Sequence, residues 1–238
     1  MIADFLIHLE TQKQIKFNNI TIYQPPLNEI IDYGVDKYNI LLVPFLLDMS
    51  DFDFADEKIV EQIDIFDILT LEQNLPLLLD SVSFFCKIDE IRFDEQKGTL
   101  YIGEDGYIDK NNFSEFAEII LQINAKQKPK KEIPPENMTD KQRDIWEKLQ
   151  AGRRRQMEKS QIDLYDLITI CQFGGNYYIS MSEILQWTMF NLTRCYKAII
   201  GKSNYQDLFD IYIVTGEEKL IKNQHWTDLI KINNNKEE

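Results

Sequence analysis

The sequence contains few of the residues that form metal and disulfide sites. Among its 238 residues are 3 cysteines and 2 histidines. Cys86, Cys171 and Cys195 are odd in number, and each lies in an apolar stretch, where a reduced thiol behaves as a small hydrophobic side chain. His8 and His225 have no second cysteine or histidine at ligand spacing. We therefore expect no disulfides, no zinc site and no cofactor.

Long apolar runs are also missing. The longest candidate, residues 38–47, is far shorter than the roughly 20 residues that a helix needs to span a bilayer, and it contains Pro44. Asp4 stands near the N-terminus, where a secretory signal would carry positive charge. These features predict an intracellular protein without a membrane segment.

Motifs typical of catalytic sites are not found. Gly201, Lys202 and Ser203 match the end of a phosphate-binding loop, but Tyr196 occupies the position of its first glycine, and the preceding segment reads as a helix instead of a strand. The simpler interpretation is a glycine that ends a helix. The acidic stretch 48–57 lacks the glycine that a calcium-binding loop requires. We expect a protein that is not an enzyme.

Basic residues are scarce except in one segment. The formal net charge is -14, and residues 1–125 carry 8 basic against 24 acidic side chains. Residues 126–159 reverse this balance, with 11 basic against 6 acidic side chains. The rest of the chain would therefore repel a phosphate backbone.

The basic segment contains an arginine triplet, Arg153, Arg154 and Arg155. Three interpretations are open: contact with nucleic-acid phosphates, a solvated helix, and a cationic helix docked on an acidic protein surface. Asp144 and Lys148 fit the second, because they form an i,i+4 pair. Acidic residues among the arginines make nucleic acid the least favoured partner.

Hydrophobic periodicity predicts an α+β fold that is mostly helical. Residues 1–125 are predicted to form an N-terminal helical domain with a small antiparallel β-meander between residues 90 and 109. A hairpin is expected over 15–23, and a short helix is expected to close at Gly34. Two capping-box pairs are predicted to begin later helices of this domain: Thr70 with Gln73, and Asn112 with Glu115.

The second half of the chain predicts a linker and a helical domain. Residues 126–159 form a basic Pro/Lys-rich linker and an exposed helix that starts at Thr139 and Gln142. Residues 160–238 form a C-terminal helical domain. In this domain Ser180 and Glu183 are expected to cap a helix that runs to Gly201, with a further helix after it.

Large aromatic residues are concentrated in the C-terminal domain, more than a small helical core needs. Because Trp, Tyr and Arg dominate binding hot spots, some of them are candidates for contact with another protein. The predicted partner-binding residues are Trp187, Phe190, Tyr196, Tyr212, Trp226, Arg153, Arg154 and Arg155.

Four stretches resemble, in order along the chain, tail-region proteins of phages and prophages of Gram-positive bacteria. They are PLNEIIDYGVDKYNILLVPFLLDMSDF, GYIDKNNFSEFAEIILQIN, DLYDLITICQFGGNYYISMSEILQWTMFNLTRCYKAI and HWTDLI. Proteins of this group are described as tail assembly chaperones. The resemblance implies a chaperone in the host bacterial cytoplasm that binds tail proteins such as the tape-measure or tube proteins, and a homo-oligomer is compatible with it.

Two alternatives stay open. The protein could remain in the virion tail as a structural tail or baseplate component. A more remote alternative is a phage regulator that binds nucleic acid through residues 141–159.

Overall fold

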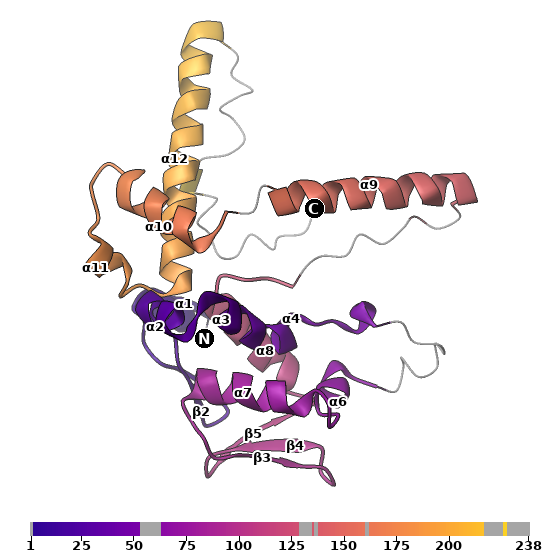
Figure 1. Cartoon of the computed structure of the whole chain (residues 1–238). Helices are drawn as coiled ribbons and strands as arrows, with labels where there is room; N and C mark the ends of the chain where they lie inside the picture. Colours follow the sequence, from indigo (N-terminus) through magenta and orange to yellow (C-terminus); the bar gives the residue numbers. More distant parts are fainter. Residues whose placement is uncertain are drawn as a thin grey trace.

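A computed structural model describes residues 2–52, 63–128, 135, 138–159, 162–216 and 226–227. Helices dominate the chain, and two small antiparallel sheets accompany them, which confirms the predicted α+β, mostly helical class. The elements of the first 125 residues form one body, and the long helix α12 (Met189–Thr215) projects away from it (Figure 1). None of the described helices is both long and apolar enough to cross a membrane.

The chain begins with helix α1 (Ile2–Glu10), and the predicted two-stranded hairpin follows it. Strands β1 (Ile15–Phe17) and β2 (Ile20–Ile22) pair antiparallel. Asn18 and Asn19 connect them with φ angles of 43° and 63°. Two successive left-handed residues are typical of the tight hairpin turn whose twist matches its strands, and asparagine tolerates that conformation.

Three short helices follow the hairpin: α2 (Leu27–Tyr33), α3 (Val35–Leu41) and α4 (Val43–Leu46). Gly34 closes α2 at a φ of 97°, a region that residues with a side chain rarely adopt, so the predicted role of this glycine is confirmed. Pro44 lies in the first turn of α4, where its missing N–H costs no helical hydrogen bond. A 3-10 turn, η1 (Met49–Asp51), comes next.

The capping box expected at Thr70 is wrong. Thr70 ends α6 (Ile65–Leu69) instead, and its hydroxyl donates to the carbonyl of Phe66. The box forms one helix earlier, where Asp64 caps α6. Helix α7 (Leu75–Cys86) therefore begins only after Asn74, whose side chain donates back to the carbonyl of Ile68. The sequence also predicts a helical stripe of Ile59, Ile63, Phe66 and Leu69, of which Ile59 lies outside the described residues.

The predicted three-stranded meander is confirmed. Strands β3 (Ile91–Asp94), β4 (Thr99–Ile102) and β5 (Gly106–Asp109) pair antiparallel in chain order. Helix α8 (Phe113–Ile123) follows, as predicted, but the expected capping box at its start does not form. The side chain of Asn112 accepts from the N–H of Asp109 instead, so it closes the preceding turn.

Helix α9 (Asp140–Lys159) starts with the predicted capping box. The backbone N–H of Thr139 donates to Gln142 over 2.8 Å, and the N–H of Gln142 donates back to the Thr139 hydroxyl over 3.4 Å. Asp144 and Lys148 form the predicted i,i+4 ion pair at 2.8 Å.

The C-terminal helices differ from the prediction at two places. Helix α10 (Leu164–Phe173) ends at Gly174. Ser180, however, caps only the short α11 (Met181–Ile184), and a new cap at Thr188 begins α12. Gly201 does not end a helix: it is buried within α12, which continues to Thr215 as one helix of 27 residues.

Contacts with the N-terminal body explain the break before α12. The carbonyls of Leu185 and Trp187, which a continuous helix would use internally, accept from the N–H groups of Asn28 and Leu27 at the start of α2. These N–H groups have no partner inside α2, because the first turn of a helix leaves its donors free. Pro26 and Thr188 form an isolated antiparallel β-bridge beside them.

A polar contact and a shared core strengthen this joint. Arg194 of α12 forms an ion pair with Glu10 of α1, and the side chain of Asn191 donates to the Glu10 carbonyl over 3.2 Å. Buried residues from both sides of the linker, including Phe116 and Leu192, belong to one hydrophobic cluster. The boundaries of the predicted domains, at residues 125 and 160, stay predictions.

Candidate protein-interaction surface

The predicted partner-binding residues near the start of α12 point mainly inward. Phe190 is 7% exposed and belongs to the core, so its side chain is not presented to a partner. Trp187 and Tyr196 are half-buried and pack against that core. The carbonyl of Trp187 also binds α2, which gives this residue a structural role at the joint.

Tyr212 and Trp226 lie further along the chain. Tyr212 is half-buried, and its ring centroid lies 6.2 Å from that of Phe209, one helical turn earlier. Trp226 is half-buried in a short 3-10 segment with Thr227. The structure therefore distributes the predicted aromatic residues along the chain and does not gather them into one patch.

The arginine triplet lies in the last two turns of α9. Arg153 is exposed and engaged in a polar interaction, and the side chains of Arg154 and Arg155 lie outside the described part of the structure. Ile145 and Leu149, at i,i+4 spacing on the same helix, are 49% and 58% exposed. This helix therefore presents an apolar pair together with basic residues.

A second aromatic group is exposed around the loop after α10. It consists of Phe173, Tyr177 and Tyr178, which we call the aromatic loop patch; their exposed fractions are 66%, 84% and 65%. The rings of Phe173 and Tyr178 contact each other at 5.6 Å, and the side chain of Gln172 donates to the Tyr178 hydroxyl over 3.2 Å. Sequence analysis missed this patch, although Gly174 and Gly175 beside it signal a surface turn.

The distal end of α12 carries the other large exposed apolar group. Residues 208–215, which we call the α12 tip, include Phe209, Ile211, Ile213 and Val214, with exposed fractions of 39%, 47%, 65% and 85%. Phe209 and Ile213 share one side of the helix at i,i+4 spacing, whereas Ile211 and Val214 share another at i,i+3. A solvated helix normally has one apolar side only, so this tip has the composition of a covered helix.

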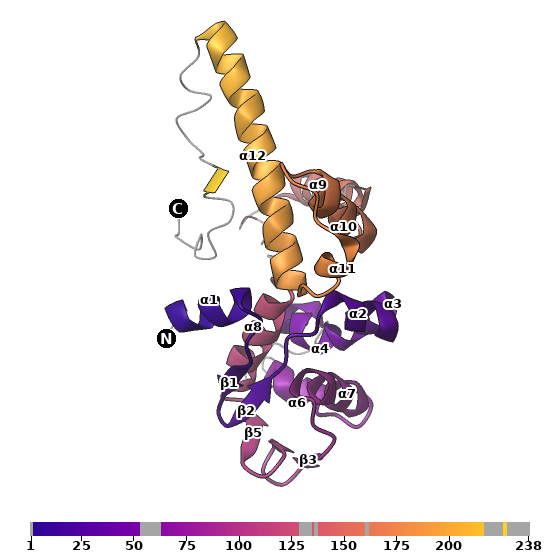
Figure 2. The same ribbon diagram turned by 90° about the vertical axis from the view of Figure 1, so that its left-hand side faces the viewer.

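The helix carrying the tip is well separated from the body. Both views show α12 extending beyond α10 and the remaining helices, and its upper turns stand clear of the other labelled elements (Figures 1 and 2). Polar residues precede the tip along the helix, and Gln206 donates to Asp210 over 3.3 Å along one edge. The tip thus presents apolar side chains at the far end of a helix that extends beyond the body.

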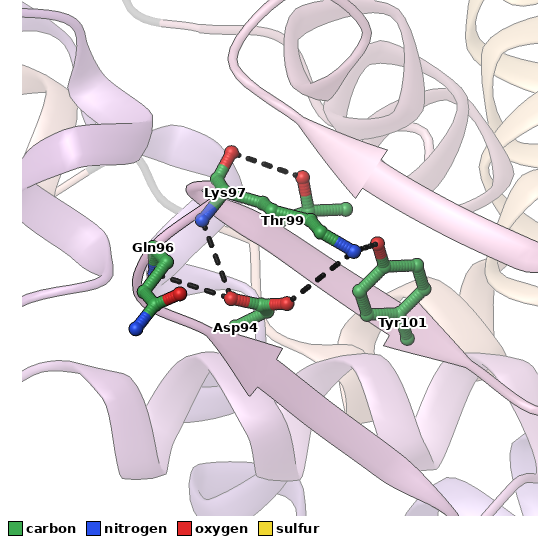
Figure 3. Close-up of polar contacts among 5 residues, drawn as sticks. All are labelled: Asp94, Gln96, Lys97, Thr99 and Tyr101. Atoms are coloured by element: carbon green, nitrogen blue, oxygen red, sulfur yellow. Dashed lines mark hydrogen bonds and ion pairs between the residues drawn. The ribbon is translucent and has the colours of Figure 1, made fainter.

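A polar cluster lies at the β3–β4 turn (Figure 3). The Asp94 carboxylate accepts from the N–H groups of Gln96 and Lys97, and the Lys97 ammonium lies 3.8 Å from Asp94 and 3.3 Å from the Tyr101 hydroxyl. The hydrogen bond to Tyr101 raises the pKa of Lys97. A lysine base needs a lowered pKa, so the cluster stabilises the turn and supplies no nucleophile.

A second polar cluster joins α2 to α7. The Tyr23 hydroxyl donates to Glu29 over 2.8 Å, and Lys87 forms an ion pair with the same carboxylate. Lys87 also lies over the rings of Tyr23 and Phe84, at 4.8 and 4.6 Å from their centroids. Burial and the Glu29 charge raise the pKa of Tyr23 to about 12. Every member has a partner, so this cluster is structural.

Within the described residues, no group of three or more His, Cys, Asp or Glu side chains is placed to hold a metal ion. The chain matches no protein-family model, and neither the curated proteins nor the solved structures contain a match to it. Among the described residues, the exposed apolar surfaces are therefore the candidate functional features.

Proposed function

We propose that this protein is a non-enzymatic phage tail morphogenesis protein, an assembly chaperone that binds the tape-measure protein in the host cytoplasm. The observation that carries the proposal is the α12 tip, where Ile213 and Val214 are 65% and 85% exposed on a helix that projects from the body. The resemblance of the sequence to tail-region proteins directs the choice of partner.

The chemistry of the tip suits an amphipathic helix as its client. Phe209 and Ile213 offer apolar contacts along one side of a helix, and a client helix with residues at i, i+3 and i+4 spacing packs against such a row. Binding covers apolar surface on both partners, which provides the driving force. The net charge of -14 keeps the resulting complex soluble.

A second contact would strengthen client binding. The aromatic loop patch lies on a different element from the α12 tip, and Tyr and Phe side chains supply large contact area at low entropic cost. If one client segment reaches both surfaces, the second contact forms at high effective concentration. A long helical tape-measure protein offers repeated segments for such bivalent binding.

The test compares two paired substitutions in the full-length protein. Ile213→Ser with Val214→Ser removes the most exposed apolar side chains of the tip. The matched control is Ile40→Ser with Val43→Ser on the body, where the replaced side chains are 52% and 38% exposed. Each variant is co-expressed with the tape-measure protein of the same phage, and the soluble tape-measure protein that co-purifies is quantified after circular dichroism has verified folding.

We expect the tip variant to lose at least about tenfold in captured tape-measure protein, equivalent to about 1.4 kcal/mol, while the control stays at the wild-type level. Equal capture by the tip variant would refute the role of the tip. Finished particles are probed for the same chain: its absence supports a chaperone, whereas fixed copies per particle would replace this function with that of a structural tail or baseplate component.

A further inference from the structure

The contact between α10 and α12 brings two of the three cysteines together. Cys171 of α10 is fully buried, and its thiol donates a hydrogen bond to the carbonyl of Leu192 on α12, with 3.5 Å between sulfur and oxygen. Cys195 stands three residues after Leu192, so it lies on the same side of α12. Cys195 is half-buried and therefore closer to solvent than Cys171.

The two helices pack closely at this point. A Cβ atom placed on Gly174 would stand 3.2 Å from Cγ2 of Ile199, so the absence of a side chain at Gly174 permits the close approach. The contacts follow the same direction along both helices: Cys171 contacts Leu192, and Gly174, later in the chain, contacts Ile199. Both views show α10 beside α12 (Figures 1 and 2). The cysteines thus lie inside a fixed helix–helix contact.

The two thiols also interact with each other. A hydrogen bond with Cys171 lowers the pKa of Cys195, against the opposing effect of burial. The same interaction, together with burial, raises the pKa of Cys171. Of the two thiols, Cys195 is therefore the one that ionises first. The thiolate is the form that attacks disulfides.

We propose that Cys195 and Cys171 form a reversible disulfide between α12 and α10 by exchange with a small-molecule disulfide of the glutathione class. The Cys195 thiolate attacks one sulfur of oxidised glutathione, which forms a Cys195–glutathione disulfide and releases one glutathione thiolate. Cys171 then loses its proton and attacks the sulfur of Cys195, which releases the second glutathione. Two protein thiols are oxidised, and one oxidised glutathione is reduced to two reduced ones.

The disulfide would close the chain between residues 171 and 195. That loop contains α11 and the backbone that binds α2, namely the carbonyls of Leu185 and Trp187. Crosslinking limits the freedom of this loop in the unfolded chain, so oxidation stabilises the joint between α12 and the body. The inference stands independently of the proposed function, because it rests on the α10–α12 contact alone.

The experiment treats the native, full-length protein with oxidised glutathione, alkylates the remaining thiols under denaturing conditions and analyses the tryptic peptides without reduction. Trypsin cuts after Arg194, so the two cysteines fall in separate peptides, residues 160–194 and 195–197. We expect these peptides to be joined, with a mass lower by two hydrogens than their sum, and Cys86 to be the one alkylated thiol. Reduction should separate them again.

Single substitutions separate the two steps. Cys171→Ala removes the second attacking thiol, so Cys195 should accumulate a glutathione adduct. Cys195→Ala should leave Cys171 unmodified, because the first attacking thiol is gone. Cys86→Ala is the matched control: Cys86 is 5% exposed, burial raises its pKa to about 12, and its loss should not alter crosslinking.

Thermal unfolding of the oxidised and the reduced wild-type protein supplies a second readout. Oxidised wild-type protein should melt several degrees above the reduced form, and the shift should vanish in Cys195→Ala. The proposal is overturned if Cys195 of the wild type keeps a glutathione adduct without crosslinking, if both thiols stay free after oxidation, or if the crosslink includes Cys86.

Discussion

The N-terminal body and the segment around α10 place their aromatic residues differently. In the body, five phenylalanines are fully buried: Phe45, Phe66, Phe85, Phe113 and Phe116. Around α10, by contrast, Tyr165, Phe173 and Tyr177 are 66% exposed or more. Aromatic content alone therefore does not identify an interface. The deciding feature is whether other elements surround the residue.

The buried phenylalanines form a connected network around Phe45. Its ring centroid lies 5.9 Å from Phe85, 6.3 Å from Phe113 and 5.9 Å from Phe116. These separations are typical of favourable aromatic pairs. The pairs link α4, α7 and α8 into one aromatic network, whereas among the described residues the exposed side chains of the α12 tip are not surrounded in this way.

The largest expected effect on stability comes from removing one aromatic ring from the core of the body and one from the exposed group around α10. Phe116→Ala leaves a cavity in the core and should lower the free energy of unfolding by about 3 to 5 kcal/mol. Phe173→Ala removes a ring that is 66% exposed and should change it by at most about 0.5 kcal/mol. Urea titration of both variants measures the difference. Similar losses would mean that Phe173 is covered in solution.

Two glycines make a matched pair of smaller effects. An alanine Cβ at Gly106 would stand 2.7 Å from the Ile102 carbonyl oxygen and 2.8 Å from Cγ1 of Ile20, so Gly106→Ala should destabilise the body by about 1 to 3 kcal/mol. Nothing lies within 4 Å of that position at Gly152 in α9. Gly152→Ala should therefore favour helix α9 by about 1 kcal/mol.

Denaturation measures the first of these glycine variants, and helical content by circular dichroism measures the second. A Gly106→Ala protein as stable as the wild type would show that β2 and β5 separate easily. Lower helical content in Gly152→Ala would show that α9 is packed against another surface at Gly152.

A helix cap tests the joint between the two regions. Thr188 is 1% exposed, and its hydroxyl accepts from the N–H of Asn191 over 3.3 Å at the start of α12. Thr188→Ala should cost about 1 kcal/mol and should accelerate amide hydrogen exchange in the first turns of α12. Ser180→Ala, which removes the cap of the short α11, is the control. Faster exchange in α12 after the control substitution would contradict the separate capping of the two helices.

The smallest effect is a pH dependence in the body. The pKa of Tyr23 is raised from 10.0 to about 12 by burial and by Glu29, so folding favours its neutral form. The stabilisation is complete below pH 10 and is lost as the pH rises toward 12. Burial also raises the pKa of Tyr38, so ultraviolet titration should show at least these two tyrosines ionising late, and Tyr23→Phe should reduce the late-titrating signal by one tyrosine. An unchanged late-titrating signal in Tyr23→Phe would refute the contact with Glu29.

Local sequence signals predicted the elements of the body well. Asn18 and Asn19 gave the hairpin, Gly34 gave a helix end, and the alternation after residue 90 gave the meander. Each of these signals determines the structure of only the few residues around it, so a short stretch of sequence is enough to recognise the element. The error at Thr70 arose because its hydroxyl donates to the carbonyls of Phe66 and Asp67 at the end of α6, so it does not cap the next helix.

The missed features depend on contacts between distant parts of the chain. The break before α12 requires Leu27 and Asn28 to capture carbonyls near residue 186. Gly201 continues its helix although a glycine is a common helix end. For the same reason, sequence alone could not divide the aromatic residues into buried Phe190 and exposed Tyr177.

The continuity of α12 also constrains how this sequence can vary in length. Its 27 residues make a rod of about 40 Å, with Arg194 fixed to the body near one end and Val214 near the other. Inserting a single residue between these positions would rotate everything beyond it by about 100° around the helix axis. Length changes of seven or eleven residues nearly preserve the orientation, because each comes within about 20° of a whole number of turns. Viable relatives should therefore gain or lose residues in this rod in such steps.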